Sequence, residues 1–335
     1  MERFKLLLWP ILCLCLVGCH KNTYFPAHIE EVSVPIIRFD QALMNVNRET
    51  VREDIRVLWN EYETFMPVFM EDILGIAAED TDYLCEALPN FLEDTVYGFQ
   101  ETNQRVKETF VNTQSIEKQL NTAFSRIHYL YPEWEIPQLY FFISGFNASI
   151  LFLDNDIAVG ADMYLGSDYA LYNRVVYDYQ KQTMRPECIA TDVVSAYLFR
   201  HLPYTSDKSR LLENMLYRGK VMYLLAQIMS PQEKWETMGY TKQQWQWCEK
   251  YERSIWHKMM DQKGLFKAEN MVLTSYLNDG PFTSEISQEA PARIGTWIGW
   301  RIAESYMQHN PEVSLQQLMA EGDAQTILEN SYYRP

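Results

Sequence analysis

One block of the sequence is unlike the rest and limits the folds that this chain can adopt. The segment Ile136–Gly166 holds three short runs rich in β-branched and aromatic residues, which are Gln138–Ile143, Ala148–Leu153 and Asp156–Gly160. Turn-forming residues separate the runs, first Gly145-Phe146-Asn147 and then Asp154-Asn155. This pattern predicts a small sheet that is partly connected by hairpins.

Helical patterns dominate the remainder of the chain. Apolar residues recur at three- and four-residue spacing in several stretches, which are Val51–Tyr62, Ile116–Tyr131, a helix that begins near Pro186, Leu211–Leu225 and residues 291–308. Three capping boxes predict the starts of later helices, at Ser230–Glu233, Thr241–Gln244 and Ser314–Gln317. The fold class is therefore α+β, mostly α, with one small β-sheet.

The helix predicted for residues 291–308 carries Gly295 and Gly299 one turn apart. In a helix that is not inserted in a membrane, such a pair predicts close packing on a neighbouring helix more often than a membrane dimer face. The sequence shows no repeat, low-complexity run or Gly/Ser linker after residue 36. We therefore expect a single domain over residues 36–335.

The first residues have the three parts of a lipoprotein signal. Arg3 and Lys5 give a positive end, and Leu6–Val17 is apolar but shorter than the roughly 20 residues that a membrane span needs. Leu16-Val17-Gly18-Cys19 then matches a lipobox. We expect residues 1–18 to be a signal peptide, Cys19 to be lipidated, and residues 19–35, which lack periodicity, to form a tether. His20 after the cysteine favours the outer membrane, with the domain in the periplasm.

The charge of the chain excludes some classes of partner. The net charge is −16, and residues 1–18 contribute one net positive charge, so the remaining chain carries −17. Such an acidic protein is not expected to bind nucleic acid.

Besides the lipidated residue, the chain after the signal has three cysteines, Cys85, Cys188 and Cys248. These are too few and too widely spaced for a disulfide framework, although one pair could form in an oxidising periplasm.

Known catalytic and metal-binding motifs are missing from the sequence. No two of the six histidines are four residues apart, so the zinc motif H-E-x-x-H is absent, and there is no C-x-x-C or G-x-S-x-G. The sequence thus predicts no metal and no cofactor. A weak calcium site at Asp154 and Asp156 is less favoured than a hairpin turn. Trp245 and Trp247 could form a carbohydrate platform, but core packing is the preferred interpretation.

The chain resembles the GldB family, the gliding-motility lipoproteins of Bacteroidota and their relatives in species that do not glide. The motifs that carry the resemblance occur in order along nearly the whole chain after the signal: Ile37–Asp40, Ile136-Pro137, Ile143–Asn147, Gly160–Gly166, Arg185–Glu187, Tyr217–Lys220, Trp247–Glu249 with Glu252 and Ile255-Trp256, Pro291–Gly295, Trp297–Trp300, Ser305–Met307 and Ser331–Pro335. Tyr332 stands where the family usually has lysine.

The resemblance implies a zincin-like fold with a degenerate metal site. In zincin-like peptidases, the helix after the small sheet carries H-E-x-x-H, and a glutamate in a later Glu-Gly pair is the third ligand. The corresponding residues here are Thr191 and Ser195 in place of the two histidines, Asp192 in place of the base, and Arg218 in place of the third ligand. Two hydroxyls and a guanidinium do not hold Zn²⁺. The resemblance therefore implies a cleft without a metal and without catalysis.

Three functions follow from these observations, in descending order. The first is a non-catalytic lipoprotein that binds an envelope partner of the gliding or secretion machinery, or a peptide, in the cleft. The second is a hydrolase with an atypical site that uses Asp192, Glu187 or His201. The third is a carbohydrate-binding lipoprotein that uses exposed tryptophans among Trp245, Trp247, Trp297 and Trp300.

Overall fold

The computed structural model describes residues 24–261 and 264–335. The expected signal peptide and Cys19 lie outside the described residues. The elements, in chain order, are β1 (Ile36–Ile37), α1 (Phe39–Leu43), α2 (Val51–Glu61), α3 (Phe65–Val68), a π-helical segment (Phe69–Leu74), α4 (Thr81–Glu93), α5 (Phe99–Thr109), α6 (Gln114–Leu130), β2 (Leu139–Phe142), β3 (Ile150–Leu153), β4 (Asp156–Gly160), α7 (Tyr172–Val175), α8 (Ile189–His201), α9 (Leu211–Met229), α10 (Lys234–Met238), α11 (Lys242–Asp261), α12 (Asn270–Leu277), α13 (Ile294–His309), α14 (Leu315–Ala320) and α15 (Ala324–Ser331). The mostly helical α+β class is confirmed.

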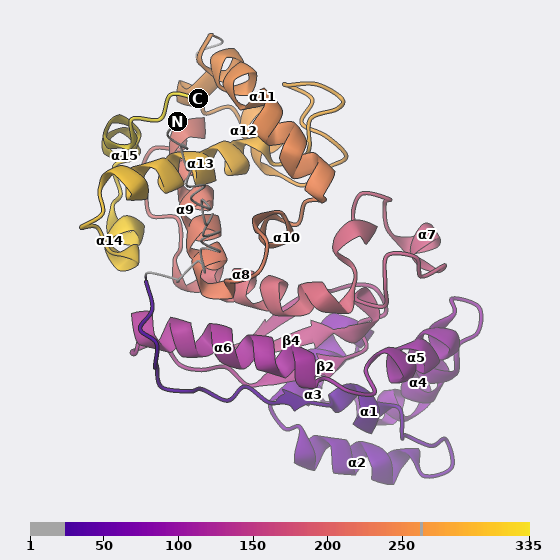
Figure 1. The fold of residues 1–335 in the computed structure, drawn as a ribbon. Coiled ribbons are helices and arrows are strands. Elements are labelled where there is room, and N and C mark those ends of the chain that lie inside the picture. Colours follow the sequence, from indigo (N-terminus) through magenta and orange to yellow (C-terminus); the bar gives the residue numbers. More distant parts are fainter. Residues whose placement is uncertain (1–23, 262–263) are drawn as a thin grey trace, which may run out of the picture.

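The elements form two halves that meet at α8 (Figure 1). The first half of the chain surrounds the sheet, with α6 and α8 beside it and α1 to α5 beyond. The second half is assembled around α9 and α13, with α11, α12, α14 and α15 outside them. The short helix α10 lies between the two halves. Among the described helices, none is long and apolar enough to cross a membrane.

The sheet contains the three expected strands and one that the sequence analysis missed. Its order is β1-β2-β4-β3, and β2 is parallel to both β1 and β4, whereas β3 and β4 form an antiparallel hairpin. Asp154, in the turn of that hairpin, has a left-handed backbone with φ of 50°, a conformation that aspartate tolerates. Strands β2 and β3 are shorter than the expected runs Gln138–Ile143 and Ala148–Leu153, while β4 has the expected bounds Asp156–Gly160.

Strand β2 is buried on both faces because each face meets aromatic side chains. Tyr140 and Phe142 lie on one face and contact Phe65 of α3. Phe141 points to the opposite face, where its ring lies 5.3 Å from that of Phe110. This alternation follows from the two-residue period of a strand, and it explains why β2 is a continuous apolar run.

The helices α9 and α13 cross in direct backbone contact. A Cβ added to Gly219 of α9 would lie 2.1 Å from the carbonyl carbon of Gly299 in α13. One added to Gly299 would lie 1.9 Å from the carbonyl oxygen of Met215. Gly295, one turn earlier, lies against Tyr276 of α12. The prediction that the glycines of this helix mediate close packing is therefore confirmed.

Two of the three predicted capping boxes are present. Ser314 and Gln317 cap α14 reciprocally, and Thr241 and Gln244 exchange the same two bonds at the start of α11. The third is wrong, because Ser230 terminates α9 and the next helix, α10, begins only at Lys234. There the backbone carbonyl of Ser230 instead accepts a hydrogen bond from Arg126 of α6.

The described part of the expected tether is packed against the domain. The backbone N–H of Val32 donates to Ser125 Oγ, and that of Val34 donates to Asn121 Oδ1, both on α6. Val34 itself is buried. Further toward the N-terminus, the Tyr24 hydroxyl lies 2.8 Å from the hydroxyl of Tyr223 on α9. The chain is therefore held against α6 and α9 before β1 begins.

Candidate functional site

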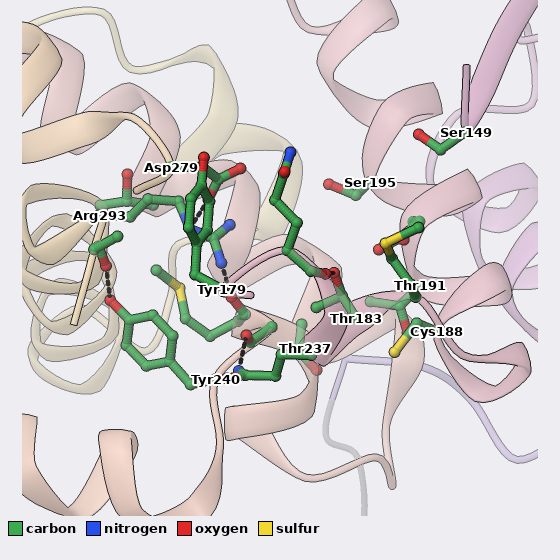
Figure 2. Close-up of a pocket in the computed structure, with 18 of the residues that line it drawn as sticks. Ser149, Tyr179, Thr183, Cys188, Thr191, Ser195, Thr237, Tyr240, Asp279 and Arg293 are labelled. Atoms are coloured by element: carbon green, nitrogen blue, oxygen red, sulfur yellow. Dashed lines mark hydrogen bonds and ion pairs between the residues drawn. The ribbon is translucent and has the colours of Figure 1, made fainter. Parts of the chain in front are cut away.

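A pocket of about 810 Å³ lies between the two halves of the fold. Its walls come from α8, α9 and α10, from the loops around residues 176–184 and 277–281, and from the start of α13. Figure 2 shows Thr191, Ser195 and Cys188 on one wall and Arg293, Asp279 and Tyr240 on the opposite one. A volume of this size is typical of sites for organic ligands.

The four residues that the resemblance singled out all line this pocket. Thr191, Asp192 and Ser195 come from the first two turns of α8, where residues one turn apart share a helix face. Arg218 comes from the middle of α9. The Thr191 hydroxyl donates a 3.0 Å hydrogen bond to Gln232 Oε1. All four side chains therefore lie on the lining of one pocket, three of them on α8 and one on α9.

The carboxyl group of Asp192 on this wall has a strongly perturbed pKa. Burial raises its pKa to about 7, against the lowering effect of a hydrogen bond from Tyr164 and the charge of Arg293. The Tyr164 hydroxyl lies 3.0 Å from Asp192 Oδ2. At neutral pH the carboxyl is therefore divided between its protonated and ionised forms.

Tyr164 reaches Asp192 because a second buried carboxylate fixes the chain just before it. Asp162 follows β4 in a 3₁₀ turn and is fully buried. Its oxygens accept hydrogen bonds from the backbone N–H groups of Ser144 and Phe146, at 2.8 and 2.7 Å, and from the Ser144 hydroxyl at 3.0 Å. Burial raises the pKa of Asp162, and these hydrogen bonds lower it. The loop after β2 and the turn after β4 are therefore locked together beneath the pocket.

Two arginines bring positive charge to the pocket. Arg218 donates from Nη1 to the backbone oxygen of Leu277, at 2.7 Å. Arg293 precedes α13 with a left-handed backbone, φ 60°, and its Nε lies 2.9 Å from Asp279 Oδ1. Arg293 also donates from Nη2 to the backbone oxygen of Met238, at 2.5 Å. Both guanidinium groups are partly buried.

The opposite wall was not identified from the sequence. It includes Tyr179, Thr183, Tyr240, Asp279 and Arg293 (Figure 2). Most of these residues lie in irregular segments, where periodicity gives no information. Arg293 is the exception with a sequence signal, because it stands inside one of the motifs that carry the family resemblance.

The other candidate catalytic residues lie elsewhere. Glu187 is exposed, with one oxygen 3.9 Å from Arg185. His201, at the end of α8, packs on Trp134 and Tyr197 and lines a different cavity, of about 280 Å³. Asp156 accepts a hydrogen bond from the backbone N–H of Gln138, which is a structural role. Of the candidates for catalysis, only Asp192 lies in the large pocket.

The tryptophans do not form a row that faces solvent. Trp245, Trp297 and Trp300 are buried and pack on one another beside the crossing of α9 and α13. Trp247 is half-buried against Tyr251. The carbohydrate platform considered for these side chains is therefore wrong. Of Trp245 and Trp247, for which core packing was preferred, Trp245 is in the core.

Within residues 24–261 and 264–335, no three His, Cys, Asp or Glu side chains are grouped so that they could hold a metal ion. Cys85, Cys188 and Cys248 are free thiols. Cys188 lines the large pocket, and burial raises its pKa to about 12, so its reactive thiolate form is scarce at neutral pH.

Comparison with known proteins gives one family and no individual relative. Neither the curated proteins nor the solved structures include a match to this chain. The sequence model described as gliding motility protein GldB matches residues 22–335, which is nearly the whole chain. The chain thus belongs to the GldB family of gliding-motility lipoproteins.

Proposed function

We propose that this protein is a lipoprotein anchored through Cys19, which acts by binding an envelope protein or a peptide-like ligand in the large pocket and does not turn it over. The family match supports a role connected with the motility machinery. The sequence around Cys19 supports lipidation, and His20 supports an outer-membrane site facing the periplasm.

One observation carries this proposal. The pocket is large enough for an organic ligand, and it is lined by Thr191, Ser195 and Arg218. These are the residues that the family resemblance aligns with the metal ligands of a zincin-like peptidase. These residues do not fit a metal ion. Hydroxyl groups are poor zinc ligands, one of the two is engaged with Gln232, and a guanidinium repels a cation. A cleft with this lining suits association better than metal-assisted hydrolysis.

A second candidate function is favoured by the state of Asp192. A carboxyl whose pKa is raised to about 7 by burial in a cleft is suited to general acid–base work. Under this alternative, Asp192 would activate a water molecule for hydrolysis of a peptide-like substrate. The two functions differ in whether a bound peptide leaves the pocket intact.

A single assay separates them. The full chain in detergent is incubated with a pool of randomised pentapeptides, and retained and cleaved peptides are measured by equilibrium dialysis and mass spectrometry. We expect retention without cleavage, and we expect Ser195→Trp, which places an indole ring on the α8 wall of the pocket, to abolish retention. Ser209→Trp, at an exposed loop position, is the matched control. If Ser195→Trp lowers the melting temperature, Thr183→Trp on the opposite wall replaces it.

Two outcomes would contradict the proposal. Peptide cleavage that is lost in Asp192→Asn would establish the hydrolase alternative. Retention that persists in both Ser195→Trp and Thr183→Trp, one on each wall, would place the binding site outside the pocket.

The anchor is tested separately by intact-mass measurement of protein purified from membranes. We expect a mature chain that begins at Cys19 and carries two or three acyl chains. We also expect Cys19→Ser to abolish this modification. A chain that retains residues 1–18 without lipid would refute this part of the proposal.

A further inference from the structure

Arg218 is a partly buried cation without a counterion in the described part of the chain. It makes none of the ion pairs found among residues 24–261 and 264–335. Its one hydrogen bond, from Nη1 to the backbone of Leu277, engages a neutral acceptor. A guanidinium has five N–H donors in a planar fork, so most of the donors of Arg218 remain available at the pocket.

The surroundings of Arg218 do not neutralise it. Burial lowers its pKa, and the like charge of Arg293 also lowers it, while Tyr217 and Asp279 act in the opposite sense. Asp279 is 72 % exposed and already paired with Arg293. An arginine nevertheless keeps its charge in proteins. The desolvated charge of Arg218 is therefore only weakly compensated by the protein.

The remaining carboxyl groups that line the pocket do not serve as its counterion. Asp192 is bonded to Tyr164, and burial raises its pKa to about 7, so it is only partly ionised at neutral pH. Glu236 lies near Cys188, whose pKa its charge helps to raise. Both groups line the same pocket as Arg218, and neither is within ion-pair distance of it.

From this arrangement we infer that the pocket binds the C-terminal carboxylate of a peptide, with Arg218 as the residue that pairs with it. The inference rests on the proposed binding function of the pocket and specifies its ligand. A carboxylate matches the planar fork of a guanidinium and pairs with it through two parallel hydrogen bonds. A monoanion fits better than a phosphate dianion, because Asp192, Glu236 and Asp279 line the same pocket and repel a second negative charge.

The rest of the pocket suits the body of a peptide. A carboxylate fills only a small part of about 810 Å³. The lining also offers neutral hydrogen-bonding groups, among them Gln180, Thr183 and Thr237. Thr296, on the first turn of α13, lines the pocket with a buried hydroxyl that has no hydrogen-bond partner within the described residues. Such groups match the amide donors and acceptors of a peptide backbone.

The test compares two forms of the same randomised pentapeptide pool, one with a free C-terminus and one with a C-terminal amide. Retention by the full chain is measured by equilibrium dialysis, with inorganic phosphate as a competitor in a parallel set. We expect the free acids to be retained at least 10-fold more than the amides. Phosphate at millimolar concentration should displace less than half of the bound acids.

Variants assign the effect to Arg218. Arg218→Gln keeps a donor for the carbonyl of Leu277 but removes the charge, so we expect retention of the acids to fall to the level of the amides. Arg218→Lys keeps the charge without the fork and should lose about 3- to 10-fold. Arg253→Gln, on the exposed face of α11, is the matched control and should behave as the native chain.

The outcomes distinguish this inference from the function on which it rests. If both forms of the pool are retained equally and Arg218→Gln has no effect, the carboxylate assignment is wrong while the binding function stands. If phosphate displaces the acids fully, the site is a general oxyanion site and the assignment is again wrong. If neither form is retained, the proposed binding function fails as well.

Discussion

Replacing Asp192 with asparagine should change how the stability of the protein depends on pH. In the folded chain, burial raises the pKa of this carboxyl to about 7 from a value of 3.8 without the protein environment. The folded state therefore binds its proton more tightly than the unfolded state does. The contribution of Asp192 to the free energy of unfolding is therefore fully present below about pH 4. It is lost as the pH rises toward 7, because the carboxylate is better solvated in the unfolded chain.

The size of the effect follows from the shift. Each pKa unit corresponds to about 1.4 kcal/mol, so a shift of about three units sets an upper limit of about 4 kcal/mol. Asp192 is partly exposed to the pocket, which reduces the loss. We expect the free energy of unfolding of Asp192→Asn, relative to the native chain, to rise by about 1–2 kcal/mol between pH 5 and pH 8.

The measurement is urea denaturation of the full chain at pH 5, 6, 7 and 8. Asparagine can still accept the hydrogen bond from Tyr164, so the comparison isolates the charge. Taking the difference between variant and native chain also cancels the contribution of Asp162, whose pKa is raised as well. Asp207→Asn, at an exposed position outside the pocket, should keep the native pH slope. A difference between Asp192→Asn and the native chain that stays constant from pH 5 to pH 8 would show that this carboxyl is not desolvated.

Three further substitutions test the framework, each by urea denaturation at pH 7. Gly299→Ala should lower the free energy of unfolding by about 3 kcal/mol or more, because its Cβ would overlap the backbone of α9. The control Gly322→Ala, with open space around it, should change this free energy by less than about 0.5 kcal/mol. Equal effects of the two substitutions would contradict the backbone contact. Asp162→Asn should cost about 2–3 kcal/mol, since an amide cannot accept from N–H groups on both sides, and a neutral result would mean that the loop is held by other contacts. Tyr333→Phe should cost about 1–2 kcal/mol through loss of the hydrogen bond to Glu252, and unchanged stability would indicate that the C-terminus is not docked there.

The long elements of this fold could be predicted because each buries one face over several turns. The stripe over Ile116–Tyr131 gave α6 almost to the residue, and the β-rich block gave the three longer strands. Strand β1 has only two residues, which is too short for any periodicity. The parallel pairing of β2 with β4 was equally inaccessible, because a run of apolar residues does not identify its neighbour in the sheet.

Local sequence motifs did not predict the structure where tertiary contacts determine the backbone conformation. The motif at Ser230–Glu233 has the composition of a capping box, but Arg126 binds the carbonyl of Ser230 and the helix starts later. In the pocket, the residues on α8 and Arg218 could be placed through the family resemblance. The wall that includes Tyr179 and Asp279 comes from irregular segments far apart in sequence, and only the folded chain brings it to the pocket.

The docking of the chain start on α6 and α9 has a consequence for the geometry of an anchored molecule. Tyr24, which lies against Tyr223 of α9, is five residues after Cys19. Whatever their conformation, five residues reach at most about 18 Å, less than the thickness of the hydrocarbon layer of a bilayer. If Cys19 carries the lipid, the domain stays close to the membrane surface. The side of the domain that bears Tyr24 then faces the membrane.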